Sequence, residues 1–165
     1  MKTNKALSYD DVLLMPQYSD IRSRTEIDTS MDLGGDVTLE LPVLSSPMDT
    51  VSETDMALAL SNNGGAAVIH RYNTIQQQAD IVTTARTTEP NIKLGAAIGV
   101  TGDYLNRAAV MRALEVDFLC VDVAHGHHIL MKEALQQLRA KFGPDIHIMA
   151  GNVATLQGIN DLADW

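Results

Sequence analysis

The feature that most constrains the fold of this chain is a fivefold alternation of short apolar runs with amphipathic stretches of ten or more residues. The five units are PVLSSPMDTV with SETDMALALSNN, GGAAVIHR with TIQQQADIVTTAR, LGAAIGV with TGDYLNRAAVMRALE, DFLCVDVAH with HHILMKEALQQLRAKFG, and IHIMAGNVA with TLQGINDLADW. Such alternation predicts parallel strands covered by helices, in either a doubly wound sheet or a (β/α)8 barrel. The barrel is favoured, because neither a G-x-G-x-x-G nor a Walker loop follows a strand.

The rest of the chain predicts one domain. The length of 165 residues, with 45% hydrophobic and 20% charged residues, is typical of a single globular domain. A polar segment of about 40 residues comes first, and its Gly34 and Gly35 predict a turn. Ser52 and Asp55 match the S-x-x-[DE] pattern and predict the start of the first helix of the repeat.

Charge and cysteine content exclude several classes of function. A net charge of -9 and a pI near 4.8 argue against a surface that binds nucleic acid or an anionic membrane, although they allow a local phosphate site. One cysteine cannot form an internal disulfide, and neither a signal peptide nor a membrane span of roughly 18 apolar residues is present. We therefore expect a cytoplasmic protein.

Polar residues gather where the predicted strands end. The strand ends read SSPMDT, HRYN, GVTGD, DVAHGH and GNVAT, and in both candidate architectures these ends carry the chemistry. Asp122 closes an apolar run, and burying an unpartnered carboxylate costs several kcal/mol, so its side chain must be solvated, paired or used. A helix cap or a loop salt bridge would explain Asp122 as well as a ligand would.

Six segments, in order, resemble the inosine monophosphate (IMP) dehydrogenase and GMP reductase family over nearly the whole chain. They are SYDDVLLMPQYS, LSSPMDTVSE, GGAAVIHR, AAIGV, VDVAHGHH and IMAGNVAT. The resemblance, which is nearest to the dehydrogenase, implies a (β/α)8 barrel, normally a homotetramer, that binds a purine nucleotide and NAD. In such a dehydrogenase a cysteine thiolate adds to C2 of the inosine ring, hydride passes to NAD, and the thioimidate is hydrolysed.

The resemblance also assigns residues. It places Ser46 and Met48 at the nucleotide, Asp122 at the nicotinamide-side ribose of NAD, and Asn152 beside the catalytic loop and the cofactor. The chemistry of the side chains agrees, since a carboxylate accepts hydrogen bonds from a ribose diol and an amide both donates and accepts.

The chain departs from the family in length. A barrel of eight units takes about 250 residues, and only about the first five units occur here. The resemblance places the nucleophilic cysteine and most of the potassium site after a sixth strand, so we expect no catalytic residue in this chain. Alone it should be inactive, needing a complementary carboxy-terminal half. Cys120, in the middle of a strand, is interpreted as structural.

Several alternatives stay open. The connection between residues 86 and 94 is too short for the paired regulatory modules of many dehydrogenases, and GMP reductases, which use NADPH, lack those modules too. The serine and proline of SSPMDT and the glycines of GGAAVIHR favour the dehydrogenase. A noncatalytic piece that must assemble with a partner is a further alternative, because five units leave strand edges open. A Schiff-base aldolase is set aside, since no lysine ends a strand.

Histidines at the strand ends receive no role in this interpretation. His125, His127 and His128 lack cysteine or carboxylate partners at metal-ligand spacing, so solvated loop side chains are favoured over a metal site. His70 and Arg71 could contact a phosphate or a base, or make structural or intersubunit contacts.

Overall fold

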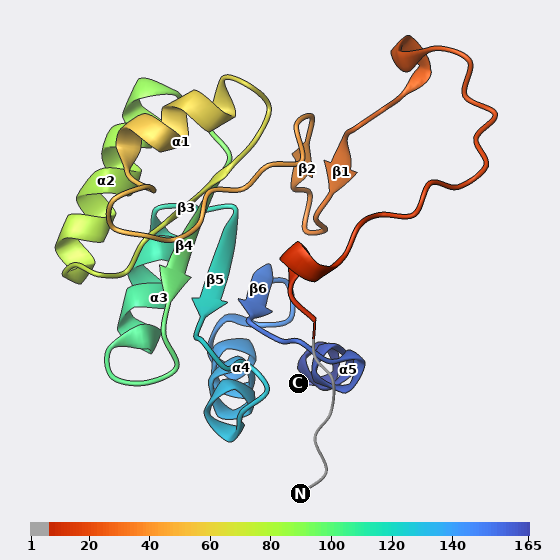
Figure 1. The fold of residues 1–165 in the computed structure, drawn as a ribbon. Helices are drawn as coiled ribbons and strands as arrows, with labels where there is room; N and C mark the ends of the chain where they lie inside the picture. The colour runs from red at the N-terminus through yellow and green to blue at the C-terminus, as the bar shows by residue number, and fades with distance from the viewer. Residues whose placement is uncertain (1–6) are drawn as a thin grey trace, which may run out of the picture.

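A parallel four-stranded sheet forms the centre of the protein, whose computed structural model describes residues 7–165. Its strands lie in the order β3-β4-β5-β6, so neighbours in the sequence are neighbours in space (Figure 1). Their bounds are Ala67–Ile69, Leu94–Ile98, Phe118–Asp122 and Ile148–Gly151. The expected parallel α/β class is thereby confirmed, and the sheet is consistent with part of a barrel.

Five α-helices alternate with these strands as the sequence pattern predicts. They are α1 (Thr54–Ser61), α2 (Ile75–Thr88), α3 (Tyr104–Ala113), α4 (Ile129–Phe142) and α5 (Leu156–Asp164). The start of α2 shows why: the Thr74 hydroxyl accepts a hydrogen bond from the Gln77 amide, and the Gln77 side chain accepts one from the Thr74 amide. This capping box satisfies backbone donors that the first helical turn leaves free.

The first predicted strand does not form as a full strand. The segment meets the sheet at an isolated parallel bridge between Leu44 and Ala66 and through the Ser45 hydroxyl, which accepts a hydrogen bond from the Val68 amide. Pro42 and Pro47 enclose the segment, and a proline has no amide hydrogen to donate to a strand partner. The prediction of five strands was therefore wrong for the first one, and the sheet has four strands plus this bridge.

The predicted start of the first helix was also wrong. Helix α1 begins at Thr54, and Glu53, in the N-cap position, makes no side-chain capping bond. Ser52 lies outside the helix with none of its surface exposed, and its hydroxyl bonds Ser45 and Ser46 instead. A buried hydroxyl must find partners, and here those partners are in the preceding loop rather than in the helix.

An antiparallel hairpin precedes the sheet. Strands β1 (Met31–Asp32) and β2 (Thr38–Leu39) pair across a turn in which Gly34 and Gly35 have φ of 83° and 57°. These positive values confirm the predicted turn and suit glycine.

The segment before the hairpin is extended. Its 3-10 turns are η1 (Tyr9–Asp11) and η2 (Arg24–Glu26), and between them the chain loops outward on the side opposite α1 and α2 (Figure 1). Leu13 and Leu14 there are each 98% exposed. In residues 7–165, no helix combines the length and apolarity that crossing a bilayer requires.

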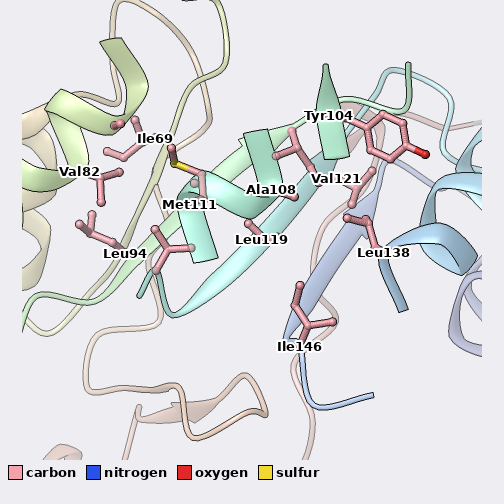
Figure 2. Close-up of a cluster of buried hydrophobic side chains, with 14 of the residues drawn as sticks. Ile69, Val82, Leu94, Tyr104, Ala108, Met111, Leu119, Val121, Leu138 and Ile146 are labelled. Carbon is pink, nitrogen blue, oxygen red and sulfur yellow. The ribbon is translucent and has the colours of Figure 1, made fainter. Parts of the chain in front are cut away.

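The two faces of the sheet have different coverings. One face packs against the helices in a large core, part of which is labelled in Figure 2. The other face carries a smaller cluster consisting of Val37, Leu39, Ala66, Val68, Ala97, Phe118 and Cys120, to which the hairpin contributes but none of the described helices does. A doubly wound sheet has helices on both faces, so this one-sided covering is consistent with the barrel interpretation.

Candidate functional site

The carboxyl ends of β5 and β6 hold two predicted site residues side by side. Asp122 pairs in register with Gly151, the residue before Asn152. The Val123 amide donates to the Gly151 carbonyl at 3.0 Å, and the Asn152 amide donates to the Val123 carbonyl at 2.8 Å. The structure therefore brings Asp122 and Asn152 together.

A glycine closes the contact between the loops that follow these strands. The Gly126 amide donates to the Asn152 carbonyl at 2.8 Å. A β-carbon added at Gly126 would lie only 2.9 Å from the Gly151 carbonyl carbon, so the two backbones could not approach as they do with any larger residue. The loops are joined next to a cavity of about 210 Å³ lined by Ala124, His125, His127, Asn152, Val153, Ala154 and Thr155.

Asp122 lacks the partners that a structural explanation needs. The side chain is half-buried, and among residues 7–165 no ion pair involves its carboxylate. Helix α4 is capped by His128, whose Nδ1 accepts a hydrogen bond from the Leu130 amide, so Asp122 is not the cap. A half-buried carboxylate with free oxygens suits a ligand with two adjacent hydroxyl groups.

Ser46 and Met48 lie in a separate part of the same edge. Ser46 is exposed and Met48 is 51% exposed. A cavity of about 280 Å³, lined by Met48, Asp49 and Tyr72, opens beside them. Strands β3 and β4 separate this loop from β5, which places the two pairs of predicted site residues roughly 14 Å apart at about 4.8 Å per strand. The pairs do not touch, although they share one edge.

Arg71, which the sequence left unassigned, lies between the two pairs. Its Nη2 donates to the Asp122 carbonyl at 3.3 Å, and its guanidinium carbon is 5.6 Å from the centre of the Tyr72 ring. The side chain therefore connects the end of β3 with the end of β5. The signal available in the sequence was a basic residue directly after a strand, but the path of its side chain could not be read there.

His70 has a structural role that the sequence left open. The imidazole is buried, and its Nδ1 accepts a hydrogen bond from the Tyr72 amide at 3.2 Å. The proton must then be on Nε2, which donates to Glu53 at 3.1 Å. His70 thus ties the chain before α1 to the end of β3.

Cys120 lies below Asp122 on the same face of the sheet, within the smaller cluster. Burial, and secondarily the nearby Asp122 charge, raises the pKa of the Cys120 thiol to about 12. A thiol nucleophile reacts as the thiolate, so Cys120 is protonated and unreactive at neutral pH. This agrees with its interpretation as a structural residue.

The three loop histidines are spread over different contacts. His127 Nε2 lies 2.7 Å from an Asp161 carboxylate oxygen, and the rings of His125 and His128 are 6.1 Å apart. Within residues 7–165, His, Cys, Asp and Glu side chains form no group of three that could hold a metal ion.

Taken together, the fold and this edge define an α/β protein whose candidate site residues lie at the carboxyl ends of parallel strands. Residues 6–165 match the model of the IMP dehydrogenase / GMP reductase domain, and the chain therefore belongs to that family of oxidoreductases. The resemblance in the six sequence segments is confirmed.

Individual relatives are similar at modest identity. An IMP dehydrogenase of Nitrosopumilus maritimus is 26% identical over 284 residues, covering 98% of this chain and 60% of the relative. A GMP reductase of Mycoplasma mycoides is 31% identical over 163 residues, covering 98% and 49%, and one of Vibrio vulnificus is 33% identical over 162 residues, covering 94% and 46%. The chain spans about half the length of the curated relatives it matches.

Proposed function

We propose that this chain forms the amino-terminal part of the catalytic (β/α)8 barrel of an IMP dehydrogenase, which oxidises IMP to xanthosine monophosphate with NAD in guanine nucleotide synthesis. The observation that carries the proposal is the joining of Asp122 and Asn152 at adjacent strand ends, beside a cavity and with the Asp122 carboxylate free of ion pairs in the described residues. Family membership supplies the reaction class.

Each proposed site residue has a physical task. The Asp122 carboxylate accepts hydrogen bonds from the nicotinamide-side ribose of NAD, and the Asn152 amide supports the cofactor and the catalytic loop. Ser46 and Met48 contact the nucleotide, the first with a short hydroxyl and the second with an apolar side chain. NAD, when bound, supplies the hydride acceptor, while this chain binds and orients both molecules. In a complex with IMP, the ligand should lie within about 4 Å of Ser46 and Met48.

The chemical step needs groups from elsewhere. Cys120, with a pKa of about 12, cannot provide the thiolate that adds to the purine ring. We therefore propose that a carboxy-terminal half supplies the nucleophile and the potassium site. The chain alone is inactive on this proposal, and the complete enzyme is a homotetramer.

GMP reductase is the second candidate, and the comparisons give a specific reason to keep it. Its relatives are 31% to 33% identical over 157–163 residues, close to the length of this chain. The dehydrogenases are 26% to 27% identical over 201–284 residues, so their alignments contain long gaps. A reductase would convert GMP to IMP with NADPH and release ammonia.

The deciding experiment joins this chain to the carboxy-terminal half of a family barrel and assays both reactions. NADH formation from IMP and NAD supports the dehydrogenase. NADPH consumption with ammonia release from GMP supports the reductase and would overturn our choice. The chain alone and the assembled enzyme, each with and without Cys120→Ser, serve as controls. Turnover by the unaided chain that the substitution abolished would contradict both the need for a second half and the structural role of Cys120.

A further inference from the structure

The loop that carries Ser46 and Met48 is closed by a residue outside it. The Ser52 amide donates to the Met48 carbonyl at 2.9 Å, and the Ser52 hydroxyl donates to the Ser46 carbonyl. The Met48 amide also donates to the Ser46 carbonyl, at 2.8 Å, which makes a tight turn around Pro47. Ser52 therefore donates hydrogen bonds to the carbonyls on both sides of Pro47, those of Ser46 and Met48.

Ser52 is itself fixed to the sheet through a second serine. The hydroxyl oxygens of Ser45 and Ser52 lie 2.7 Å apart, and the Ser45 oxygen accepts a hydrogen bond from the Val68 amide of β3 at 3.2 Å. The Ser52 hydroxyl donates toward both the Ser45 oxygen and the Ser46 carbonyl, so its one proton is shared between two acceptors. The Ser45 oxygen thus accepts from both β3 and Ser52, and this chain of bonds connects the Val68 amide to the Ser46 carbonyl through the two serine side chains.

The burial of these groups makes the arrangement rigid. Ser52 has no exposed surface and Ser45 is 9% exposed, so water cannot readily replace a lost partner. A buried polar group left without a partner carries the full cost of its desolvation, which disfavours any loop conformation that breaks the chain of bonds. By contrast, Ser46 and Met48, which this chain of bonds holds in place, face solvent.

We infer that Ser52 is a positioning residue for purine nucleotide binding, which it serves by presenting Ser46 and Met48 to the ligand in one fixed conformation. The inference rests on the proposed function for its ligand, but the geometry it describes is a property of the chain itself. Ser52 does not touch the nucleotide, and its effect passes through the two carbonyls that it holds.

The first test measures amide hydrogen exchange in the full chain by NMR. In Ser52→Ala the Met48 amide should exchange about tenfold faster than in the wild type, because the Ser46 carbonyl that accepts it loses its hydrogen bond from the Ser52 hydroxyl, while amides of α2 keep their rates. In Ser52→Thr, which retains the hydroxyl, the Met48 rate should stay within about twofold of the wild type. Unchanged Met48 exchange in Ser52→Ala overturns the inference.

The second test measures IMP affinity by calorimetry in the enzyme assembled with its carboxy-terminal half. Ser52→Ala should raise the Kd for IMP about tenfold, corresponding to the loss of one buried hydrogen bond, and Ser52→Thr should restore it. Thr74→Ala is the matched control, because it removes a hydroxyl that caps α2 and lowers stability without contacting the loop. An equal rise in Kd in Thr74→Ala would mean that Ser52 acts only through overall stability.

Two outcomes separate this inference from the proposed function. If the wild-type assembly binds no IMP, the proposed function fails, and the Met48 exchange rate still decides whether Ser52 fixes the loop. If Ser52→Ala does not fold, Ser45→Ala breaks the same chain of bonds one step earlier and must produce the same faster exchange at Met48. Slow exchange in that variant contradicts the inference.

Discussion

The two faces of the sheet differ in what packs on them: one is covered by the helices, and the other carries a smaller cluster with the candidate site residue Asp122 at its carboxyl end. On the helix-covered face, strand residues such as Leu119 and Val121 pack against α3 and α4 in a core that extends across all four strands (Figure 2). On the opposite face the buried cluster is small, and it ends at Asp122 above Cys120. Substitutions on the first face should act on stability, and those at the carboxyl end of the second on ligand affinity.

The largest expected effect is on the helix-covered face. Leu119→Ala should lower the free energy of unfolding by about 3–5 kcal/mol, the upper part of the usual range, because its cavity is enclosed on all sides. Leu39→Ala, at an equally buried leucine of the opposite cluster, should cost only about 2–3 kcal/mol, because the hairpin can relax into the space. Urea denaturation of both variants makes the comparison, and a larger loss for Leu39→Ala would reverse our account of the two faces.

A smaller effect is expected from overpacking the opposite face. A β-carbon at Gly95 would lie 2.3 Å from the Phe118 ring, which crosses the glycine from the neighbouring strand. Gly95→Ala should therefore cost about 1–3 kcal/mol, and the double variant Gly95→Ala, Phe118→Leu should recover part of that loss. Thermal unfolding of the two single variants and the double variant measures the coupling. If the stability losses of the two single variants simply added in the double variant, contact with the Phe118 ring would not be the cause of the loss in Gly95→Ala.

The Cys120 thiol, which is buried on the opposite face, should make the stability of the folded protein depend on pH. Its pKa is about 12 in the folded protein and 9.0 as a free group, so the unfolded chain loses the thiol proton first as the pH rises. The folded state should lose stability between about pH 9 and 12, by about 1.4 kcal/mol at pH 10 from this group alone. Unfolding curves of wild type and Cys120→Ala between pH 7.5 and 10 should therefore converge as the pH rises. Parallel curves would mean that the thiol ionises equally well in both states.

The sequence predicted the parts of this fold that depend on local pattern. The alternation of apolar runs and amphipathic stretches predicted the four strands and five helices, because short apolar runs are typical of buried strands and a helical spacing of apolar residues is typical of surface helices. It failed at Pro42 and Pro47, where missing amide hydrogens reduce a strand to one bridge, and at Ser52, where a helix-start pattern serves a buried loop contact. At Ser52 a tertiary hydrogen bond decides the structure rather than the local pattern, and at the two prolines the loss of backbone donors overrides the apolar pattern.

The candidate site was predictable to a similar extent. Asp122 and Asn152 were expected at the same edge because the ends of neighbouring parallel strands meet, and the structure brings them together. Their binding roles, like those of Ser46 and Met48, stay predictions. The contact of Arg71 with the Asp122 carbonyl could not be predicted, because it depends on the path of a long side chain across two strands.

Asp122 itself should contribute little to stability, since its carboxylate has no ion-pair partner among residues 7–165. In the assembled enzyme, however, Asp122→Asn keeps the shape of the side chain and weakens its acceptance of hydrogen bonds from a ribose diol. Leu119→Val serves as the control, because it perturbs the same strand on its helix-covered face, opposite the face that carries Asp122.

The most direct test of the central claim is therefore the steady-state kinetics of Asp122→Asn in the enzyme assembled from this chain and a carboxy-terminal half. We expect the KM for the dinucleotide to rise about tenfold while the KM for the purine nucleotide changes less than about twofold. The reason is that only the dinucleotide would lose a hydrogen bond to the charged Asp122 carboxylate. An equal change in both constants, or no change in either, would contradict the placement of the cofactor at the carboxyl end of β5.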